Sequence, residues 1–447
     1  MKLRSEAFGL LFAVSLTAGA GNMALQSVLP AIGREFGLPD TLVAGAFAIS
    51  ALLWILSSPL WARRSDRLGR KRIIMVGMAG FSLSMLGFGL AATLGLVGWL
   101  APLLAFALMV VARMVYGLFG SAAPIASQAY VADRTSRTER TKSMSLLASA
   151  QGLGTVIGPA VAPFFVLPVV GLAGPMYAFA LMGAVVFFAV WRRLPSGDVE
   201  RKPVDKAGAR ADKGLWKDPR VRDFLLFGLL VVSAQAINIA VLGFHVIDVM
   251  TASGTVAAVR DIQPFIGVAM LAGAAATLMV QWGLIPLFDL QPRQLMRWGA
   301  AVALLGNVLA VIGPGYYGVV IGYAVISMGI GFARPGFTAG SSLAVGAREQ
   351  GAMAGLIMAL AGLSFLAPPV VGVALYELME TAPYIANAAL LAVALVLAWI
   401  SPALRAATPD RQASPGQIPA SQPGPEGSGR NRWTVFLMPR RRVRRRQ

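Results

Sequence analysis

Long runs of apolar residues follow one another through most of the chain, and they constrain the fold more than any other feature of the sequence. Each run is about 20 residues long, which is the length that an α-helix needs to cross the hydrocarbon core of a bilayer. The chain is 57% hydrophobic and only 13% charged, whereas soluble domains average about 25% charged residues. The alternating short segments that mark a membrane β-barrel are absent from the sequence. We therefore predict an all-α integral membrane protein.

The apolar runs and the polar breaks between them predict twelve transmembrane helices. Most of the breaks are short, so neighbouring helices must run antiparallel to each other. The expected spans are residues 7–29, 42–62, 73–95, 101–131, 143–168, 171–191, 224–247, 262–285, 296–314, 317–341, 351–376 and 383–402.

Two long polar segments predict how the chain is divided. Residues 192–223 mix charges of both signs with Pro and Gly, which is typical of a cytoplasmic linker. The linker separates two six-helix bundles, at residues 1–191 and 224–404. The tail, residues 405–447, is rich in Pro, Gly, Ser and Gln and ends in a basic run. We expect it to be a disordered cytoplasmic segment that either contacts anionic lipids or remains solvated.

The positions of the cationic residues predict the orientation in the membrane. If the N-terminus is cytoplasmic, all but four of the 39 Lys and Arg residues lie in cytoplasmic loops, the linker or the termini. The exceptions are Arg34 and Arg260 in outer loops, and Arg113 and Arg334 within spans. The positive-inside rule then places both termini in the cytoplasm, most naturally at a bacterial-type inner membrane, with an organellar or plasma membrane as alternatives. The net charge of +19 follows from this topology, so we expect no nucleic-acid partner.

Several function classes are disfavoured by what the sequence lacks. The absence of cysteine excludes disulfides and thiolate metal sites. An ATP-driven pump is disfavoured because no Gly-x-x-x-x-Gly-Lys-Ser/Thr loop is present. An enzyme is disfavoured because there is no cluster of acidic, Cys or His residues. We expect a monomer in the lipid bilayer that uses no cofactor or metal and carries a small-molecule substrate.

The segment "WARRSDRLGRKRIIMVG", between the second and third expected spans, carries the most specific motif of the sequence. It resembles the signature loop of the major facilitator superfamily, Gly-x-Leu-Ala-Asp-Arg-x-Gly-Arg-Lys. Ala62 and Arg64 stand where the family has its Gly and Leu. The matching residues are Asp66, Arg67, Gly69, Arg70 and Lys71. The resemblance implies the twelve-helix fold of that family and a transport function.

The resemblance also implies roles for residues of this loop. In the family it latches the cytoplasmic helix ends when the carrier opens outward. Carried over, Asp66 would contact the start of the eleventh span near Gln350, and Arg70 would pair with Asp133 at the end of the fourth span. Gly69 would permit a tight turn between the two spans.

A second resemblance lies in the fourth span, "ARMVYGLFGSAAP". The family pattern there is an Arg, two variable residues, often a Gln, and then a Gly. Arg113 and Gly117 match this pattern, and Tyr116 replaces the Gln. An arginine within the hydrocarbon region is costly, which indicates a functional role; the alternative is that its side chain snorkels to an interface.

A third resemblance lies in the fifth span, where "GTVIGPAVAP" is similar to a motif typical of the drug/proton antiporter exporters of this superfamily. Gly154, Gly158 and Pro159 match, while Ala162 and Pro163 replace the final glycines. Small residues at this spacing let helices approach closely, and proline bends a helix where a gate must move.

The positions of the acidic residues differ from those expected of a proton-driven exporter. Proton-driven exporters usually bury a carboxylate in the N-terminal half, whereas all 20 acidic residues here fall in expected loops or at span ends. His245 is the single histidine and lies three residues before Asp248, so the two share one side of a helix. They are the candidate coupling residues, although a lone histidine near an interface is more often structural. Uniport and substrate exchange remain alternatives.

Polar residues within the expected spans predict the substrate pathway. They are few, in an interior that is otherwise apolar and rich in Met, which favours bulky amphipathic substrates over sugars. Two intramembrane arginines also favour an anionic group on the substrate. Amides in such positions are alternatively contacts between helices. The pathway residues are Asn22, Gln26, Arg113, Gln151, Gln235, Asn238 and Arg334.

The function that the sequence favours is secondary transport by alternating access, as an exporter of amphipathic compounds or drugs, with proton antiport as one mode. An uptake or exchange carrier for an organic anion is the first alternative. A membrane sensor or scaffold that transports nothing is the second.

Overall fold

The computed structural model describes residues 5–135, 137–167, 170–196, 214–254, 259–346 and 349–405. Apart from an isolated bridge between Leu167 and Gly171, the regular structure of these residues is helical. These residues all belong to one compact unit. The expected tail lies outside the described residues except for Arg405.

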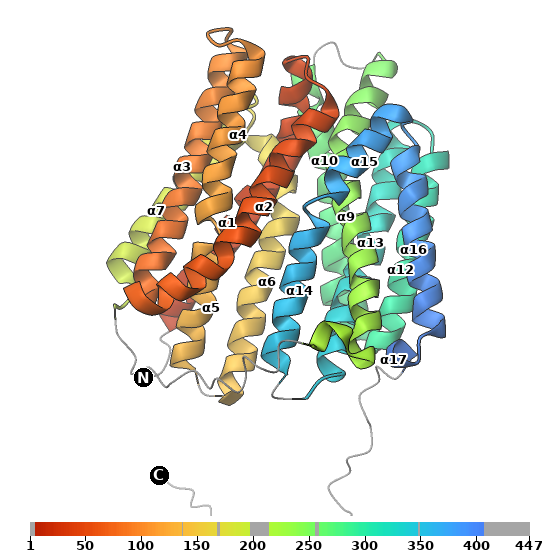
Figure 1. Cartoon of the computed structure of the whole chain (residues 1–447). Coiled ribbons are helices and arrows are strands. Elements are labelled where there is room, and N and C mark those ends of the chain that lie inside the picture. The colour runs from red at the N-terminus through yellow and green to blue at the C-terminus, as the bar shows by residue number, and fades with distance from the viewer. Residues whose placement is uncertain are drawn as a thin grey trace, which may run out of the picture. The chain divides into compact units, whose positions relative to one another are not determined.

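The N-terminal half comprises seven α-helices and a short 3₁₀ turn, η1. They are α1 (Ser5–Glu35), α2 (Asp40–Leu68), α3 (Arg70–Leu96), α4 (Pro102–Phe119), α5 (Ala122–Arg134), α6 (Arg137–Val161), η1 (Ala162–Phe165) and α7 (Gly174–Arg193). In Figure 1 these helices run from red to yellow.

The C-terminal half begins with the 3₁₀ turn η2 (Leu215–Lys217) and is drawn in green to blue in Figure 1. Its helices are α9 (Pro219–Ala252), η3 (Val259–Ile262), α10 (Gln263–Leu278), the π-helix η4 (Met279–Leu284), α11 (Ile285–Phe288), α12 (Pro292–Ile312), α13 (Gly315–Leu343), α14 (Gln350–Ser364), α15 (Pro368–Leu378), α16 (Ala382–Ile400) and α17 (Pro402–Arg405).

Within the described residues, eleven helical segments are long and apolar enough to cross a membrane. Helix α6 occupies the position of the remaining expected span. It is less apolar because four of its first six residues are charged in the sequence. A helix is therefore present at each of the twelve expected positions. The boundaries differ mainly because the helices continue past the apolar runs into the polar residues that flank them, as α1 and α2 do.

Two of the expected continuous spans are interrupted. The fourth span breaks between Phe119 and Ala122, which separates α4 from α5. The eleventh breaks before Pro368 and Pro369, which lack the N–H groups that would continue the hydrogen bonds of α14.

The two halves meet along helices at both sides of the interior. Helix α1 packs on α6 within the N-terminal half and on α9 across the interface, while α2 packs on α15 and α6 on α10. We call the end where α1 finishes and α2 begins the outer edge, and the opposite end the inner edge, following the orientation expected from the positive-inside rule.

Close approach of α1 and α6 depends on the glycines of the fifth-span motif. A Cβ at Gly158 would meet the backbone of Ala20, and one at Gly154 would lie 2.8 Å from the Ala20 nitrogen. Pro159 lies two residues before α6 ends and gives way to η1. Gly117 allows the same close approach between α4 and α2, because a Cβ at Gly117 would lie 2.7 Å from the backbone oxygen of Ser50. The motif glycines thus set the distances between helices in the N-terminal half.

Candidate functional site

Arg113 is buried in the N-terminal half, with 4% of its surface exposed. Its Nη2 group donates a hydrogen bond to Asn22 of α1. The guanidinium also lies over the rings of Phe47 on α2 and Tyr116 on α4, at 5.2 and 4.7 Å from their centres. Its Nε and Nη1 atoms are buried without a hydrogen-bond partner. Arg113 therefore does not snorkel to an interface, and part of its hydrogen-bonding capacity is unused.

Arg334 has a different environment in the C-terminal half. It lies in the interior of α13, and its Nη1 group donates to Gln235 Oε1 on α9 at 3.5 Å. The side chain therefore points toward α9 and not toward lipid. Arg334 is nevertheless exposed. An exposed side chain directed at a neighbouring helix indicates open space between the helices at this depth.

The other expected pathway residues are divided between the halves. Gln26 is buried and lines a cavity of about 10 Å³ with Pro30, Ala240 and Phe244, which is room for about one water molecule. The amide atoms of Asn238 are buried and have no partner.

Gln151 is half-buried on α6, and its backbone carbonyl oxygen would lie 2.7 Å from a Cβ at Gly19 of α1. The structure pairs Asn22 with Arg113 and Gln235 with Arg334, one pair in each half.

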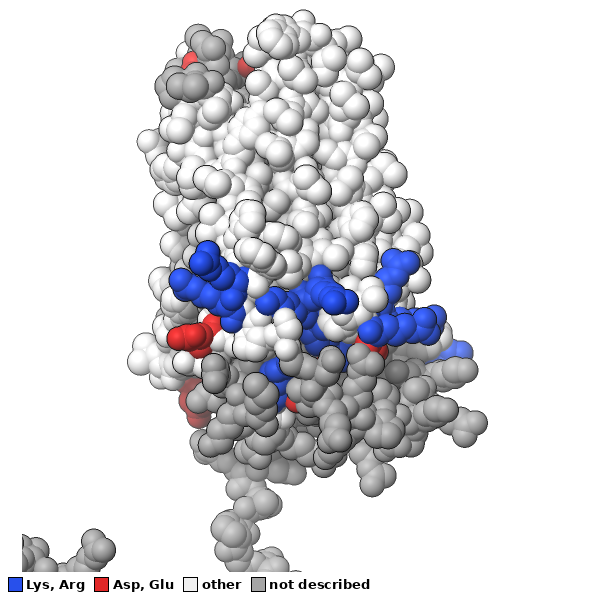
Figure 2. Space-filling model, turned by 90° about the vertical axis from the view of Figure 1, so that its left-hand side faces the viewer, with Lys and Arg blue, Asp and Glu red and all other residues white. Residues whose placement is uncertain are grey.

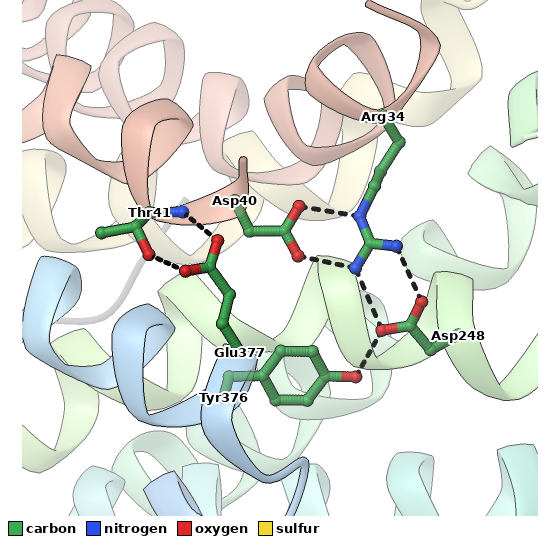
Figure 3. Close-up of polar contacts among 6 residues, drawn as sticks. All are labelled: Arg34, Asp40, Thr41, Asp248, Tyr376 and Glu377. Carbon is green, nitrogen blue, oxygen red and sulfur yellow. Dashed lines mark hydrogen bonds and ion pairs between the residues drawn. The ribbon is translucent and has the colours of Figure 1, made fainter. Parts of the chain in front are cut away.

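A network of charged groups closes the outer edge between the halves (Figure 3). Arg34, at the end of α1, donates from Nε and Nη2 to Asp40 of α2 at 2.7 and 2.6 Å. The same guanidinium donates from Nη1 and Nη2 to Asp248 of α9 at 3.0 and 3.1 Å. Two carboxylates, one from each half, therefore share a single cation.

Helix α15 adds two further contacts to this network. The Tyr376 hydroxyl donates to Asp248 Oδ2 at 2.7 Å. Glu377 accepts hydrogen bonds from the backbone nitrogen of Thr41, at 2.8 Å, and from the Thr41 hydroxyl. Figure 3 shows the two carboxylates of α2 and α9 on either side of Arg34, with Glu377 directed at the start of α2. We call these six residues the outer network: Arg34, Asp40, Thr41, Asp248, Tyr376 and Glu377.

Sequence reasoning included only Asp248 of the outer network among its candidates. A signal for Arg34 was present, because it is one of two cations on the outer side of an otherwise positive-inside chain. A cation that departs from the rule must be neutralised locally, and Asp40 lies six residues away. The contact with Asp248, 214 residues away, could not be read from the sequence.

His245 lies next to this network. Its Nδ1 atom is 2.6 Å from the Tyr384 hydroxyl, and its ring centre is 5.9 Å from that of Tyr376. His245 and Asp248 do share one side of α9, and Tyr376 contacts both. The histidine is 8% exposed. His245 therefore packs between α9, α15 and α16 and helps to hold these helices together.

The signature segment at the inner edge is more helical than the sequence indicated. Helix α2 continues through Leu68 and α3 begins at Arg70, so the expected loop is reduced to Gly69, whose φ of 92° favours glycine. Arg70 pairs with Asp66 at 2.6 Å and with Asp133 of α5 at 3.0 Å. The Arg70–Asp133 contact is the one that the resemblance implied.

Asp66 and Gln350, which the resemblance pairs with each other, have other partners in the structure. The Gln350 side chain instead bonds to Ser342 and Val345, near the end of α13. Asp66 is held by Arg70 within the N-terminal half. In this conformation the inner-edge contacts of Asp66 and Gln350 therefore stay within their own halves, while the outer edge is bridged.

Other cations of the signature segment lie in a band at the inner edge. Lys71 donates to the Trp191 carbonyl of α7 at 2.7 Å, and Arg67 is exposed. Figure 2, a view from the side of α3 and α7, shows Lys and Arg side chains gathered in this band, with an almost uncharged surface beyond it. Cations at the edge of an apolar surface are expected where the surface meets lipid headgroups.

The model of the Major Facilitator Superfamily matches residues 11–364 of this chain, which is most of its length. The chain belongs to that superfamily. Multidrug resistance protein 1 of Bacillus subtilis is 25% identical over 397 residues, covering 85% of this chain and 93% of that protein. The class D tetracycline resistance protein of Salmonella ordonez is 29% identical over 204 residues, covering 43% of this chain and 46% of that protein.

Solved structures of this superfamily share the fold. The human organic anion transporter MFSD10 (TETRAN) gives a TM-score of 0.61 at 17% identity, covering 89% of this chain and 100% of that one. A bacterial homolog of the human lysosomal transporter Spinster gives 0.66 at 13% identity, covering 89% and 96%. The predicted all-α fold of two six-helix bundles is thereby confirmed. As a superfamily member, the protein is a multi-pass membrane transporter and not an enzyme.

Proposed function

We propose that this superfamily member exports amphipathic small molecules across a bacterial-type inner membrane by alternating access, with both termini in the cytoplasm. The observation that carries the proposal is the bridged outer edge together with the exposed Arg334 inside the C-terminal half. A carrier that is closed at one edge and has open space between its helices in the interior matches one state of an alternating-access cycle. The two moving bodies would be residues 1–191 and 224–404.

The chemistry of the interior supports an amphipathic substrate. The polar groups of the pathway are few and mostly paired or buried, and the aromatic rings of Phe47 and Tyr116 lie beside Arg113. Apolar adaptable walls bind bulky substrates through dispersion and shape, with a small number of polar contacts for orientation. The multidrug and tetracycline resistance proteins among its relatives support export as the direction of transport.

An organic anion is the second candidate substrate, and one observation favours it. Arg113 keeps two buried guanidinium nitrogens without a partner, and such groups gain from an anionic acceptor. In the other half, Arg334 is exposed beside Gln235. A likeness in fold to an organic anion transporter is consistent with this candidate but adds nothing about specificity, since the identity is 17%.

Proton antiport is the proposed mode of coupling. Three titratable groups at the outer edge support this proposal, namely Asp40, Asp248 and His245, since protons entering from outside would meet them first. The alternatives are uniport and exchange. A sensor or scaffold that moves no substrate would give no flux under any gradient.

Flux into proteoliposomes with an imposed pH gradient tests these proposals. A fluorescent lipophilic cation and a fluorescent organic anion, run in parallel, separate the two substrate classes. Export of amphipathic compounds without an anionic group predicts flux of the first probe that depends on the gradient and is unaffected by Arg113→Gln. The organic anion candidate predicts flux of the second probe that falls in both Arg113→Gln and Arg334→Gln. Flux that ignores the gradient would contradict antiport, and no flux of either probe would contradict both substrate proposals.

A further inference from the structure

A groove of about 300 Å³ lies between α12 and α16, at the inner edge. Most of its wall is apolar, and both of its tryptophans, Trp298 and Trp399, are exposed. Exposed tryptophans at the end of a membrane-crossing helix are typical of the headgroup region of a bilayer. The lining residues are Arg293, Gln294, Arg297, Trp298, Ala301, Leu395 and Trp399.

Two arginines, Arg297 in the groove wall and Arg405 beside it, are held in similar ways by the last turn of α16. Arg297 donates from Nε to the Ala398 carbonyl at 3.1 Å, and its guanidinium lies 3.9 Å from the centre of the Trp399 ring. Arg405 donates from Nε to the Trp399 carbonyl at 2.6 Å. In each case Nε fixes the guanidinium, and within the described residues the Nη groups make no hydrogen bond. These groups are the part of an arginine that binds a phosphate in a bidentate manner.

A third cation makes the site strongly positive. Arg293 lies four residues before Arg297 in the first turns of α12, so two like charges share one face of the helix. Both also lie near the N-terminal end of the helix, where the macrodipole is positive. Arg405 and Arg297 both contact Trp399, so their positive charges lie at the same end of α16. Among the ion pairs of the described residues, none includes these three arginines.

We propose that the groove binds an anionic phospholipid. Its phosphodiester lies between the guanidinium groups of Arg293, Arg297 and Arg405, and an acyl chain follows the apolar wall past Trp298 and Leu395. A lipid fits better than free phosphate because the same groove is lined by two arginines and by the apolar side chains of Trp298, Ala301 and Leu395. Basic pockets between helices at the inner edge of a membrane protein are suited to such headgroups.

Lipid retention in native mass spectrometry tests this site without any transport assay. The full chain in detergent is mixed with equal amounts of dioleoylphosphatidylglycerol and dioleoylphosphatidylcholine. We expect the wild type to retain phosphatidylglycerol in preference, and each of Arg297→Gln and Arg405→Gln to reduce this preference about fivefold. Arg192→Gln, at the exposed end of α7, removes a charge from the same edge elsewhere and should leave the preference unchanged.

Two further measurements separate binding of a phospholipid from attraction by charge alone and from binding of free phosphate. Arg297→Lys keeps the charge but loses the planar fork, so its preference should lie between the wild type and Arg297→Gln. Inorganic phosphate alone should not displace phosphatidylglycerol at equal concentration. Equal retention of both lipids by the wild type, equal losses in Arg192→Gln and Arg297→Gln, or displacement by inorganic phosphate would each overturn the proposal.

Discussion

Replacing Asp248 by Asn should open the outer edge of the carrier. The change removes the charge that Arg34 contacts at 3.0 and 3.1 Å, and it weakens the acceptor of the Tyr376 hydroxyl. The Arg34–Asp248 pair joins α1 to α9, so it exists only while the two halves are closed at this edge. Its loss therefore shifts the population from the outward-closed toward the outward-open state.

The size of the shift follows from the exposure of the pair. Two charge-assisted hydrogen bonds that were fully buried would contribute about 3–6 kcal/mol. The side chains of Arg34 and Asp248 are 32% and 26% exposed, so water screens the interaction, and Arg34 keeps its pair with Asp40 in either state. We therefore expect a change of about 1–2 kcal/mol. That corresponds to a change of about 5- to 30-fold in the equilibrium between the two states.

Labelling of a single cysteine measures this equilibrium, because the natural chain contains none. Ala240→Cys places the thiol in the small cavity beside Pro30 and Phe244. A membrane-impermeant maleimide, added outside right-side-out vesicles, should react about 5- to 30-fold faster when Asp248→Asn is also present. Asp40→Asn is the matched control, since it removes a carboxylate from the same guanidinium but breaks no contact between the halves. Unchanged labelling in Asp248→Asn, or an equal increase in Asp40→Asn, would refute the reasoning.

Three further predictions concern packing, the inner edge and a helix cap. Gly158→Ala should destabilise the protein by about 1–3 kcal/mol, because the new methyl group meets the backbone of Ala20. Gly152→Ala has nothing within 4 Å and should be neutral, so equal melting temperatures for the two variants would contradict the packing argument. Asp133→Asn should slow flux in proteoliposomes by changing a contact of Arg70, whereas Asp133→Glu should restore part of the rate; a normal rate in Asp133→Asn would count against a gating role. Hydrogen bonds from Arg220 hold the pKa of Asp218, the N-cap of α9, below its ordinary value. Stabilisation by this carboxylate is therefore present above a pH of about 3.9 and is lost as the pH falls through the lowered pKa. Wild type and Asp218→Asn should differ in melting temperature at about pH 7 and converge as the pH falls below that lowered pKa.

The fold could be predicted because the bilayer fixes the length of each crossing. Twelve apolar runs predict twelve helix positions, and the signature segment by itself indicates the superfamily. The breaks within spans were missed, since the run from Pro102 to Arg134 stays apolar across the interruption at Gly120. Hydropathy measures transfer to lipid, and it carries little information about where a buried helix stops and restarts.

The site was predictable only where a single residue was unusual by itself. An arginine in the middle of a span is costly, which singled out Arg113 and Arg334 correctly as interior groups. Their partners, Asn22 and Gln235, were in the expected set, but no sequence signal linked each arginine to its own amide. Arg34 is an exception to the positive-inside rule, but the sequence does not predict a role for it. Its contact with Asp248 depends on α9, which lies more than two hundred residues away.

The outer network illustrates why a gate of this kind uses partly exposed charges. A fully buried ion pair between the halves would leave an unpaired charge in a low-dielectric site each time it opened, at a cost of several kcal/mol. The Arg34–Asp248 pair opens toward water, and Asp40 stays with Arg34, so the cation is not left unpaired when α9 moves away. A closing interaction of about 1–2 kcal/mol is large enough to bias the population and small enough for differential binding of a substrate or a proton to reverse. Sharing one arginine between a carboxylate of its own half and one of the other half therefore makes the outer edge both closed and reversible.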